Sequence, residues 1–213
     1  MSSTFRLDRA RDTLLDSTGR RFDPATRRWE SAGTTSRSDA LEEVDAIAAV
    51  TWLQRESGHP VRVPIGVIGP REATDAQLAA ALAVGELLGD CRLTVICGGR
   101  QGVMQAVCEG AARVGGWSIG LLPEADPAAA NPFVSVAIAT GIGEARNALI
   151  ARASFCLIAI GDSFGTLSEV ALGRQFGKLV VGLEGAAEVE GVQHVDTARE
   201  AVAMAAEAIL DVT

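Results

Sequence analysis

A loop between a predicted strand and a predicted helix holds the residues best suited to bind an anion. Gly161-Asp162-Ser163-Phe164-Gly165-Thr166 follows an apolar run at 155–160, and a helical pattern begins at Thr166. Glycine lets a ligand approach the backbone, and the first amides of a helix are unpaired donors at its positive end. We therefore expect the amides of 163–167 and the Thr166 hydroxyl to ring a phosphate. The alternative is helix capping by Ser163 or Thr166 without a ligand.

Two charged residues are predicted to lie near this loop. Glu169 falls in the first turn of the same helix, where it either stabilises the helix dipole or serves as a ribose ligand or an acid/base. Arg146 follows Gly141-Ile142-Gly143 near the start of a predicted helix at 144–153. It is either a solvated surface charge or a partner for a phosphate or carboxylate.

An alternation of strands and helices from residue 63 onward positions these residues. The strands are continuous apolar runs, which is typical of parallel strands covered on both faces. The pattern predicts a doubly wound α/β sheet, whose ligands bind outside the carboxyl ends of the strands. Two further glycine-rich loops, at 66–70 and 97–104, end strands at that edge. The predicted strands are 63–69, 92–97, 117–123, 134–139, 155–160 and 178–183, and the helices are 75–88, 101–114, 144–153, 166–176 and 196–210.

The N-terminal residues follow a different pattern. Turn signals at 17–19 and 23–26 separate short strand-like pieces and predict a small hairpin or meander. Ser38-Asp39 is expected to cap a helix at 40–56. We therefore expect an N-terminal extension at 1–36 and a Rossmann-like domain at 37–213.

Composition excludes several classes of protein. The net charge of −8 argues against a broad nucleic-acid surface, and the single lysine, Lys178, does not lie in a P-loop. No apolar run is long enough to span a membrane, and the first residues lack a secretory pattern, so we expect no membrane partner and a cytoplasmic location. Four cysteines without a Cys-x-x-Cys spacing and two histidines predict buried, reduced thiols and no metal site.

Several motifs together resemble one family. CGGRQGVMQAV (97–107) and GIGEARNALIARASFCLIAIGDSFGTLSEVALGRQFGKLVVGL (141–183) resemble the molybdenum cofactor carrier group of the Lonely Guy (LOG)-like superfamily, to which DprA is related. GVIGP (66–70), ANP (130–132) and Ala145-Arg146-Asn147 fit the same pattern. The resemblance covers about 63–183 and implies a Rossmann-like subunit that forms homodimers or homotetramers.

The resemblance leaves two functions open. One is a carrier that binds and protects the molybdenum cofactor or a related phosphorylated ligand, and the other is a phosphoribohydrolase that cleaves a nucleoside 5′-monophosphate. LOG enzymes carry an Arg-Lys pair and a Pro-Gly-Gly-x-Gly-Thr-x-x-Glu loop. Here Gly165, Thr166 and Glu169 match the loop, but Asn147 stands where the lysine is expected. Asn147 favours the carrier; in the hydrolase, Arg146 and Glu169 would be catalytic.

Both functions imply one binding site without a cofactor required for catalysis and without nucleic acid. The expected ligand is the molybdenum cofactor or a nucleoside monophosphate. The residues expected to bind it are Gly69, Gly98, Gly99, Arg100, Gly102, Val103, Met104, Arg146, Asn147, Gly161, Ser163, Phe164, Gly165, Thr166 and Glu169.

Overall fold

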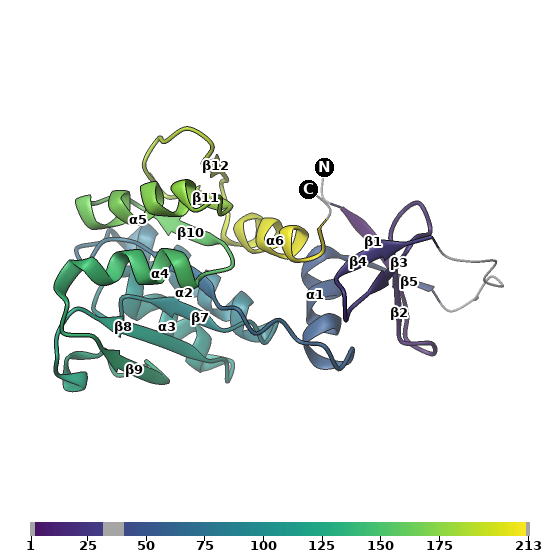
Figure 1. The fold of residues 1–213 in the computed structure, drawn as a ribbon, viewed down its shortest axis with the longest axis horizontal. Coiled ribbons are helices and arrows are strands. Elements are labelled where there is room, and N and C mark those ends of the chain that lie inside the picture. Colours follow the sequence, from purple (N-terminus) through teal and green to yellow (C-terminus); the bar gives the residue numbers. More distant parts are fainter. Residues whose placement is uncertain (1–2, 32–40, 212–213) are drawn as a thin grey trace. The chain divides into compact units, whose positions relative to one another are not determined.

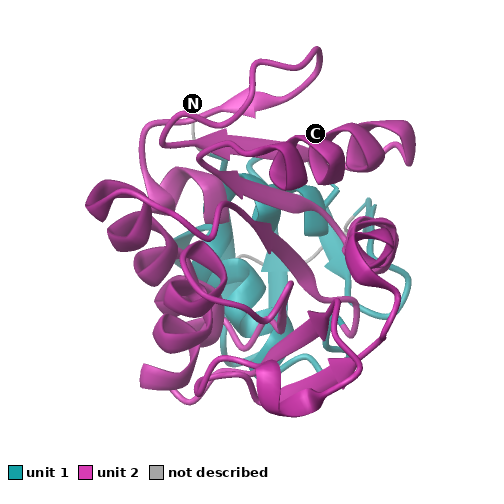
Figure 2. Cartoon of the chain, turned by 90° about the vertical axis from the view of Figure 1, so that its left-hand side faces the viewer, with its two compact units in different colours: residues 1–61, 203–213 teal, residues 62–202 magenta. Residues whose placement is uncertain are grey.

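The computed structural model describes residues 3–31 and 41–211 and divides the chain into two compact units. One unit comprises Met1–Val61 together with Ala203–Thr213, and the other comprises Arg62–Val202. Figure 2 shows the two units in different colours. The expected boundary at 36/37 lies outside the described residues, and the first unit continues beyond it to Val61.

The larger unit is built on a seven-stranded sheet in which every pairing is parallel. Its order is β12-β11-β10-β6-β7-β8-β9. Every residue of β6, β7, β10 and β11 is buried, which explains why these strands are continuous apolar runs. The strands are β6 (Ile65–Ile68), β7 (Val95–Cys97), β8 (Ser118–Leu122), β9 (Val136–Ala139), β10 (Leu157–Ile160), β11 (Val180–Leu183) and β12 (Gln193–His194).

Helices cover both faces of this sheet, so the predicted doubly wound α/β fold is confirmed. Figure 1 shows α4 and α5 on the near face and α2 and α3 behind the sheet. The helices are α2 (Asp75–Asp90), α3 (Val103–Arg113), α4 (Asn147–Ala153), α5 (Phe164–Gln175) and α6 (Ala198–Ile209), with 3₁₀ turns η1 (Pro127–Ala129) and η2 (Gly143–Arg146). The helix expected at 144–153 is therefore η2 followed by α4, and α5 begins two residues earlier than expected.

The strand order contains one point, between β6 and β10, where the direction in which successive strands are added to the sheet reverses. From β6 the chain moves outward through β7, β8 and β9, and then returns to β10 on the other side of β6. The loops that follow β6 and β10 consequently lead away from each other at the carboxyl edge. A crevice for ligands is expected at such a switch point.

The smaller unit contains an antiparallel sheet of order β4-β3-β2-β1-β5 and helix α1 (Ala46–Arg55). Phe5, Phe22 and Trp29 form its aromatic core, with Phe5 stacked on Trp29. The C-terminal residues complete the unit, because Trp29 Nε1 donates to the Leu210 carbonyl at 2.6 Å. Its strands are β1 (Thr4–Asp8), β2 (Thr13–Leu15), β3 (Arg21–Asp23), β4 (Arg28–Glu30) and β5 (Leu41–Asp45).

The helix predicted at 40–56 is wrong in its first part. Residues 41–45 form β5, which pairs antiparallel with β1 along its whole length. Helix α1 begins only at Ala46, where the Asp45 carboxylate accepts a hydrogen bond from the Ala48 amide at 2.9 Å. The expected cap at Ser38-Asp39 lies outside the described residues. Among the described residues, no helix combines the length and apolar character needed to cross a bilayer.

Candidate ligand-binding site

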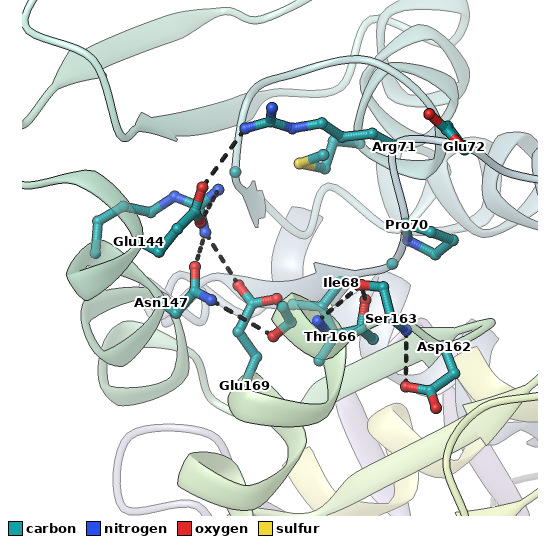
Figure 3. A pocket seen from close by; sticks show the side chains of 15 residues that line it. Ile68, Pro70, Arg71, Glu72, Glu144, Asn147, Asp162, Ser163, Thr166 and Glu169 are labelled. Atoms are coloured by element: carbon teal, nitrogen blue, oxygen red, sulfur yellow. Dashed lines mark hydrogen bonds and ion pairs between the residues drawn. The ribbon is translucent and has the colours of Figure 1, made fainter.

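A cavity of about 520 Å³ opens at the switch point between β6 and β10. Figure 3 shows its side chains converging from the loops after β6 and β10, from η2 and from the starts of α4 and α5. The lining residues are Ile68, Gly69, Pro70, Arg71, Glu72, Gly98, Met104, Glu144, Arg146, Asn147, Asp162, Ser163, Gly165, Thr166 and Glu169. Residues far apart in sequence thus share one cavity, as the sheet order requires.

The structure brings most of the sequence-predicted site residues together. Those that line the cavity are Gly69, Gly98, Met104, Arg146, Asn147, Ser163, Gly165, Thr166 and Glu169. The remaining six residues lie close to these nine in the sequence but do not line the cavity.

Three of those six are glycines with a packing role. A Cβ on Gly99 would lie 3.0 Å from the Cα of Gly120 on the neighbouring strand, and one on Gly161 would meet the Gln77 side chain at 2.3 Å. Gly102 precedes α3 with φ +70°, and a Cβ there would lie 2.3 Å from the Arg71 carbonyl. These glycines hold the surrounding loops close together rather than facing the cavity.

The other three are turned away from the cavity or paired within the protein. Arg100 forms an ion pair with Glu124. Val103 is fully buried, and its side chain packs on Gly69. Phe164 is 95% exposed at the first position of α5.

Several residues of the cavity are absent from the set predicted from the sequence. These are Ile68, Pro70, Arg71, Glu72, Glu144 and Asp162. The rule that ligands bind beyond the carboxyl ends of strands points to the loop after residue 68, and it could have included Pro70-Arg71-Glu72. Glu144 carries no comparable signal, because a charged residue at a helix start is common for reasons of helix stability alone.

The start of α5 is capped by its own side chains. The Thr166 amide donates to Ser163 Oγ at 3.1 Å, and the Ser163 amide donates to Asp162 Oδ1 at 2.8 Å. The Leu167 amide bonds to the Ser163 carbonyl at 2.8 Å. The expectation that all amides of 163–167 ring a phosphate is therefore wrong. By position, only the amides of Phe164 and Gly165 lack an acceptor within the helix.

Arg146 is the buried cation of the cavity, with 4% of its surface exposed. Its Nη1 atom lies 3.5 Å from Glu169 Oε1 and donates to Asn147 Oδ1, and its Nη2 atom lies 3.8 Å from Glu144 Oε2. Its Nε has no hydrogen-bond partner in the described part of the chain. Gly98 makes room for the guanidinium, because a Cβ there would lie 2.6 Å from Nη2.

Glu169 is buried beside Arg146, and its carboxyl group is held in the neutral form. Burial raises its pKa to about 8, because a charged carboxylate is poorly solvated there. Arg146 opposes this shift, and the negative charge of Glu144 adds to it. At neutral pH Glu169 therefore mostly carries a proton and can donate a hydrogen bond into the cavity.

Asn147 joins α4 to α5 and orients Arg146. Its Nδ2 atom donates to Ser168 Oγ at 2.9 Å and to the Gly165 carbonyl at 3.4 Å, while its Oδ1 accepts from Arg146. A neutral amide satisfies all these partners, whereas a lysine has no acceptor to offer Arg146. Asn147 therefore fixes the cavity wall without adding a second buried charge.

The cysteines behave as the composition predicts, as reduced and buried thiols. The sulfur atoms of Cys97 and Cys108 lie 3.5 Å apart. Burial raises the pKa of Cys156 to about 12, so this thiol stays protonated. Within residues 3–31 and 41–211, no group of three or more His, Cys, Asp or Glu side chains is arranged to hold a metal ion.

Fold and cavity together define a Rossmann-like protein with a polar ligand pocket at the switch point of its sheet. The chain belongs to the SLOG cluster4 family, whose model matches residues 62–209. A protein of unassigned function from Archaeoglobus fulgidus is 38% identical over 138 residues, which is 65% of this chain and 91% of that protein.

The solved structures that are similar to this chain include members of the family that the sequence resembles. The molybdenum cofactor binding protein from Rippkaea orientalis is 32% identical with a TM-score of 0.66, over 70% of this chain and 99% of that one. The molybdenum cofactor carrier protein from Chlamydomonas reinhardtii is 31% identical with a TM-score of 0.63, over 70% and 99%. DNA processing protein A from Streptococcus pneumoniae, at 17% identity and a TM-score of 0.55 over 66% and 60%, shares the fold. The predicted relationship is thus confirmed.

Proposed function

We propose that this protein binds the molybdenum cofactor, or a closely related phosphorylated ligand, and holds it as a carrier. The similarity to a molybdenum cofactor binding protein and to a molybdenum cofactor carrier protein, each covered over 99% of its length, supports this proposal. The observation that carries it is the buried Arg146, whose Nε has no partner among the described residues and whose guanidinium lines the cavity. A buried cation with an unused donor is suited to an anionic ligand.

The cavity fits such a ligand in size and chemistry. Its volume of about 520 Å³ lies within the usual range for cofactor-sized molecules. We assign the phosphate to Arg146 and the first amides of α5, because a guanidinium and a helix N-terminus both favour negative charge. Gly165 lets the remainder of the ligand approach the backbone, because the nearest atom to a Cβ there would be 3.7 Å away. A nucleoside monophosphate shares the phosphate and is the second ligand to test.

The hydrolase alternative receives no support from the similar structures. Asn147 also stands where LOG enzymes carry a lysine, so the cation that those enzymes have at this position is absent. We therefore propose binding without turnover.

The direct test is reconstitution of the purified protein with molybdenum cofactor, followed by measurement of its affinity and of the lifetime of the bound cofactor. We expect Arg146→Ala to weaken binding by about 1.5–3 kcal/mol, the usual contribution of a charge-assisted hydrogen bond. Arg113→Ala is the control, because Arg113 is an exposed arginine paired with Glu109 and Glu86. Failure of the wild-type protein to bind or protect the cofactor contradicts the carrier. Release of ribose 5-phosphate from AMP would establish the hydrolase instead.

We also propose that the protein assembles as a homodimer or homotetramer. Exposed large apolar side chains on the elements around the cavity support this proposal, since extended apolar patches are uncommon on the surfaces of monomers. They are Ile142, Leu149, Phe164 and Leu167. Light scattering after size-exclusion chromatography measures the assembly directly, and a monomer at micromolar concentration would contradict the proposal. The absence of a nucleic-acid partner and the cytoplasmic location stay predictions.

A further inference from the structure

One carboxylate at the mouth of the cavity contacts both of its arginines. Glu144 Oε1 lies 3.6 Å from Arg71 Nη2, and Glu144 Oε2 lies 3.8 Å from Arg146 Nη2. Figure 3 shows the ion pair between Glu144 and Arg71, which reaches over from the loop after β6. The two arginines come from opposite sides of the switch point, and Glu144 links them.

The charged groups that line the cavity determine how the contact between Glu144 and the two arginines affects an anionic ligand. Two guanidinium groups and four carboxyl groups line it, and the carboxyl groups belong to Glu72, Glu144, Asp162 and Glu169. An anionic ligand therefore enters a site whose positive charges are already neutralised by the protein. It can use both arginines only after Glu144 moves away from them.

Glu144 is placed where such a movement meets little resistance. Its side chain is 67% exposed and that of Arg71 is 46% exposed, and ion pairs this exposed are weak. The preceding residue, Gly143, has φ +61°, and a Cβ there would meet no atom within 4 Å. The Glu144 side chain can therefore turn while the backbone stays in place, since the Gly143 amide donates to the Pro123 carbonyl at 3.0 Å.

We propose that Glu144 is an internal competitor for the anionic group of the ligand. In the free protein it occupies Arg71 and Arg146, and a bound phosphate displaces it and is held by both guanidinium groups. Arg71 is thereby a second anion-binding residue. This inference rests on the proposed function to the extent that the ligand carries a phosphate.

Competition by Glu144 lets the site select larger phosphorylated ligands over small anions, which two free arginines would not do. A small anion must offset the displacement of Glu144 with its own contacts alone, so inorganic phosphate binds weakly. A larger ligand adds contacts along the cavity and overcomes the same competition. Glu144 thus discriminates against abundant small anions in favour of a phosphorylated molecule that fills the pocket.

Calorimetric titration with inorganic phosphate tests the competition. We expect Glu144→Gln to bind phosphate about three- to tenfold more tightly than the wild type, as expected for loss of one exposed and one partly buried ion pair. Glu86→Gln is the matched control, because Glu86 is also a partly exposed carboxylate paired with an arginine, Arg113, but does not line this cavity. It removes the same charge, and we expect its affinity to stay within about twofold of the wild type.

A second variant tests the role of Arg71. In the Glu144→Gln background, Arg71→Gln should abolish the gain in phosphate affinity. Equal phosphate affinity of wild type and Glu144→Gln, an equal gain in Glu86→Gln, or a gain that survives Arg71→Gln would each overturn the inference. Cofactor binding by the wild type distinguishes the two proposals. If the cofactor binds but Glu144→Gln changes nothing, the competition is wrong; if Glu144→Gln gains phosphate affinity without cofactor binding, the carrier is wrong.

Discussion

At the scale of single residues, Glu169 and Arg146 show how burial outweighs a neighbouring charge. The two side chains are 3.5 Å apart, and both are almost fully buried. Arg146 shares its positive charge with Glu144 and with the Asn147 amide oxygen. It therefore compensates only part of the desolvation of Glu169, and the pKa of this carboxyl group stays at about 8.

The raised pKa of Glu169 predicts a decrease in stability with increasing pH. The folded protein holds the proton up to about pH 8, whereas the unfolded chain releases it near the ordinary value of 4.5. Stability from this group is therefore fully present below pH 4.5 and is lost as the pH rises through 8. We expect Glu169→Gln to gain stability relative to the wild type across this range, by up to about 1.4 kcal/mol per pH unit.

Thermal unfolding of both proteins at several pH values measures this difference, since every other titrating group is common to the two. Glu109→Gln is a suitable control, because Glu109 is a partly exposed carboxylate paired with Arg113. A wild-type minus Glu169→Gln difference that stays constant from about pH 5 to pH 8 would show that Glu169 is ionised throughout.

The cavity illustrates which site residues a sequence can reveal. Gly98, Gly165 and Thr166 are predictable because glycine and hydroxyl residues directly after a buried strand are typical of a ligand-binding loop. Phe164 is predicted only as their neighbour, and it faces solvent. The strand-end rule could have placed Arg71 at this edge of the sheet, but its contact with Glu144 depends on the strand order and not on any local pattern.

At the scale of elements, α2 and α3 pack so closely that their backbones touch through glycines. A Cβ on Gly85 of α2 would lie 2.2 Å from the Val107 carbonyl oxygen. A Cβ on Gly110 of α3 would lie 2.1 Å from the Leu82 carbonyl oxygen. Helix α3 of this pair also contacts the cavity lining, because its Val103 side chain packs on Gly69.

This contact predicts that Gly110→Ala is destabilising, although alanine favours helices by about 1 kcal/mol. The added methyl group meets backbone on the facing helix, so the helices must separate, and we expect a net loss of about 1–3 kcal/mol. Gly165→Ala is the control, because the nearest atom to its Cβ would be Ser163 Oγ at 3.7 Å. Thermal denaturation compares the stability of Gly110→Ala and Gly165→Ala. An unchanged or raised Tm for Gly110→Ala would show that α2 and α3 can separate with little loss of stability.

The elements of the larger unit are predictable because their signals are local. Buried parallel strands are continuous apolar runs, and Thr74 and Gln77 form a capping box that marks the start of α2. Residues 41–45 are not predictable in this way. Val44 is buried in β5 and also fits a helical stripe with Ile47, so the pairing with β1 decides the outcome.

At the scale of the whole molecule, the chain returns to its first unit at its end. Helix α6 begins in the larger unit, and from Ala203 onward its residues belong to the smaller one. Ala205, Ala206 and Leu210 are buried, and the Ser3 amide donates to Glu207 at 2.9 Å. The end of this helix thus belongs with the N-terminal residues, a grouping that no local pattern reveals because Trp29 and Leu210 are 181 positions apart.

This arrangement predicts that a substitution near the C-terminus weakens residues near the N-terminus. Leu210 is fully buried, and its carbonyl accepts the Trp29 indole hydrogen bond. We expect Leu210→Ala to destabilise the smaller unit by about 2–5 kcal/mol, the usual cost of a large core truncation. Ile138→Ala is the control, because Ile138 in β9 of the larger unit is 45% exposed.

Limited proteolysis with trypsin distinguishes the two units, because arginines are frequent among residues 1–61. Leu210→Ala should accelerate cleavage within residues 3–31 and 41–61, while the larger unit, which carries the whole cavity, keeps its ligand affinity. Local opening makes sites accessible in proportion to the lost stability, so the change in cleavage rate reports the destabilisation directly. Unchanged cleavage near the N-terminus would mean that residues 203–211 do not stabilise the smaller unit.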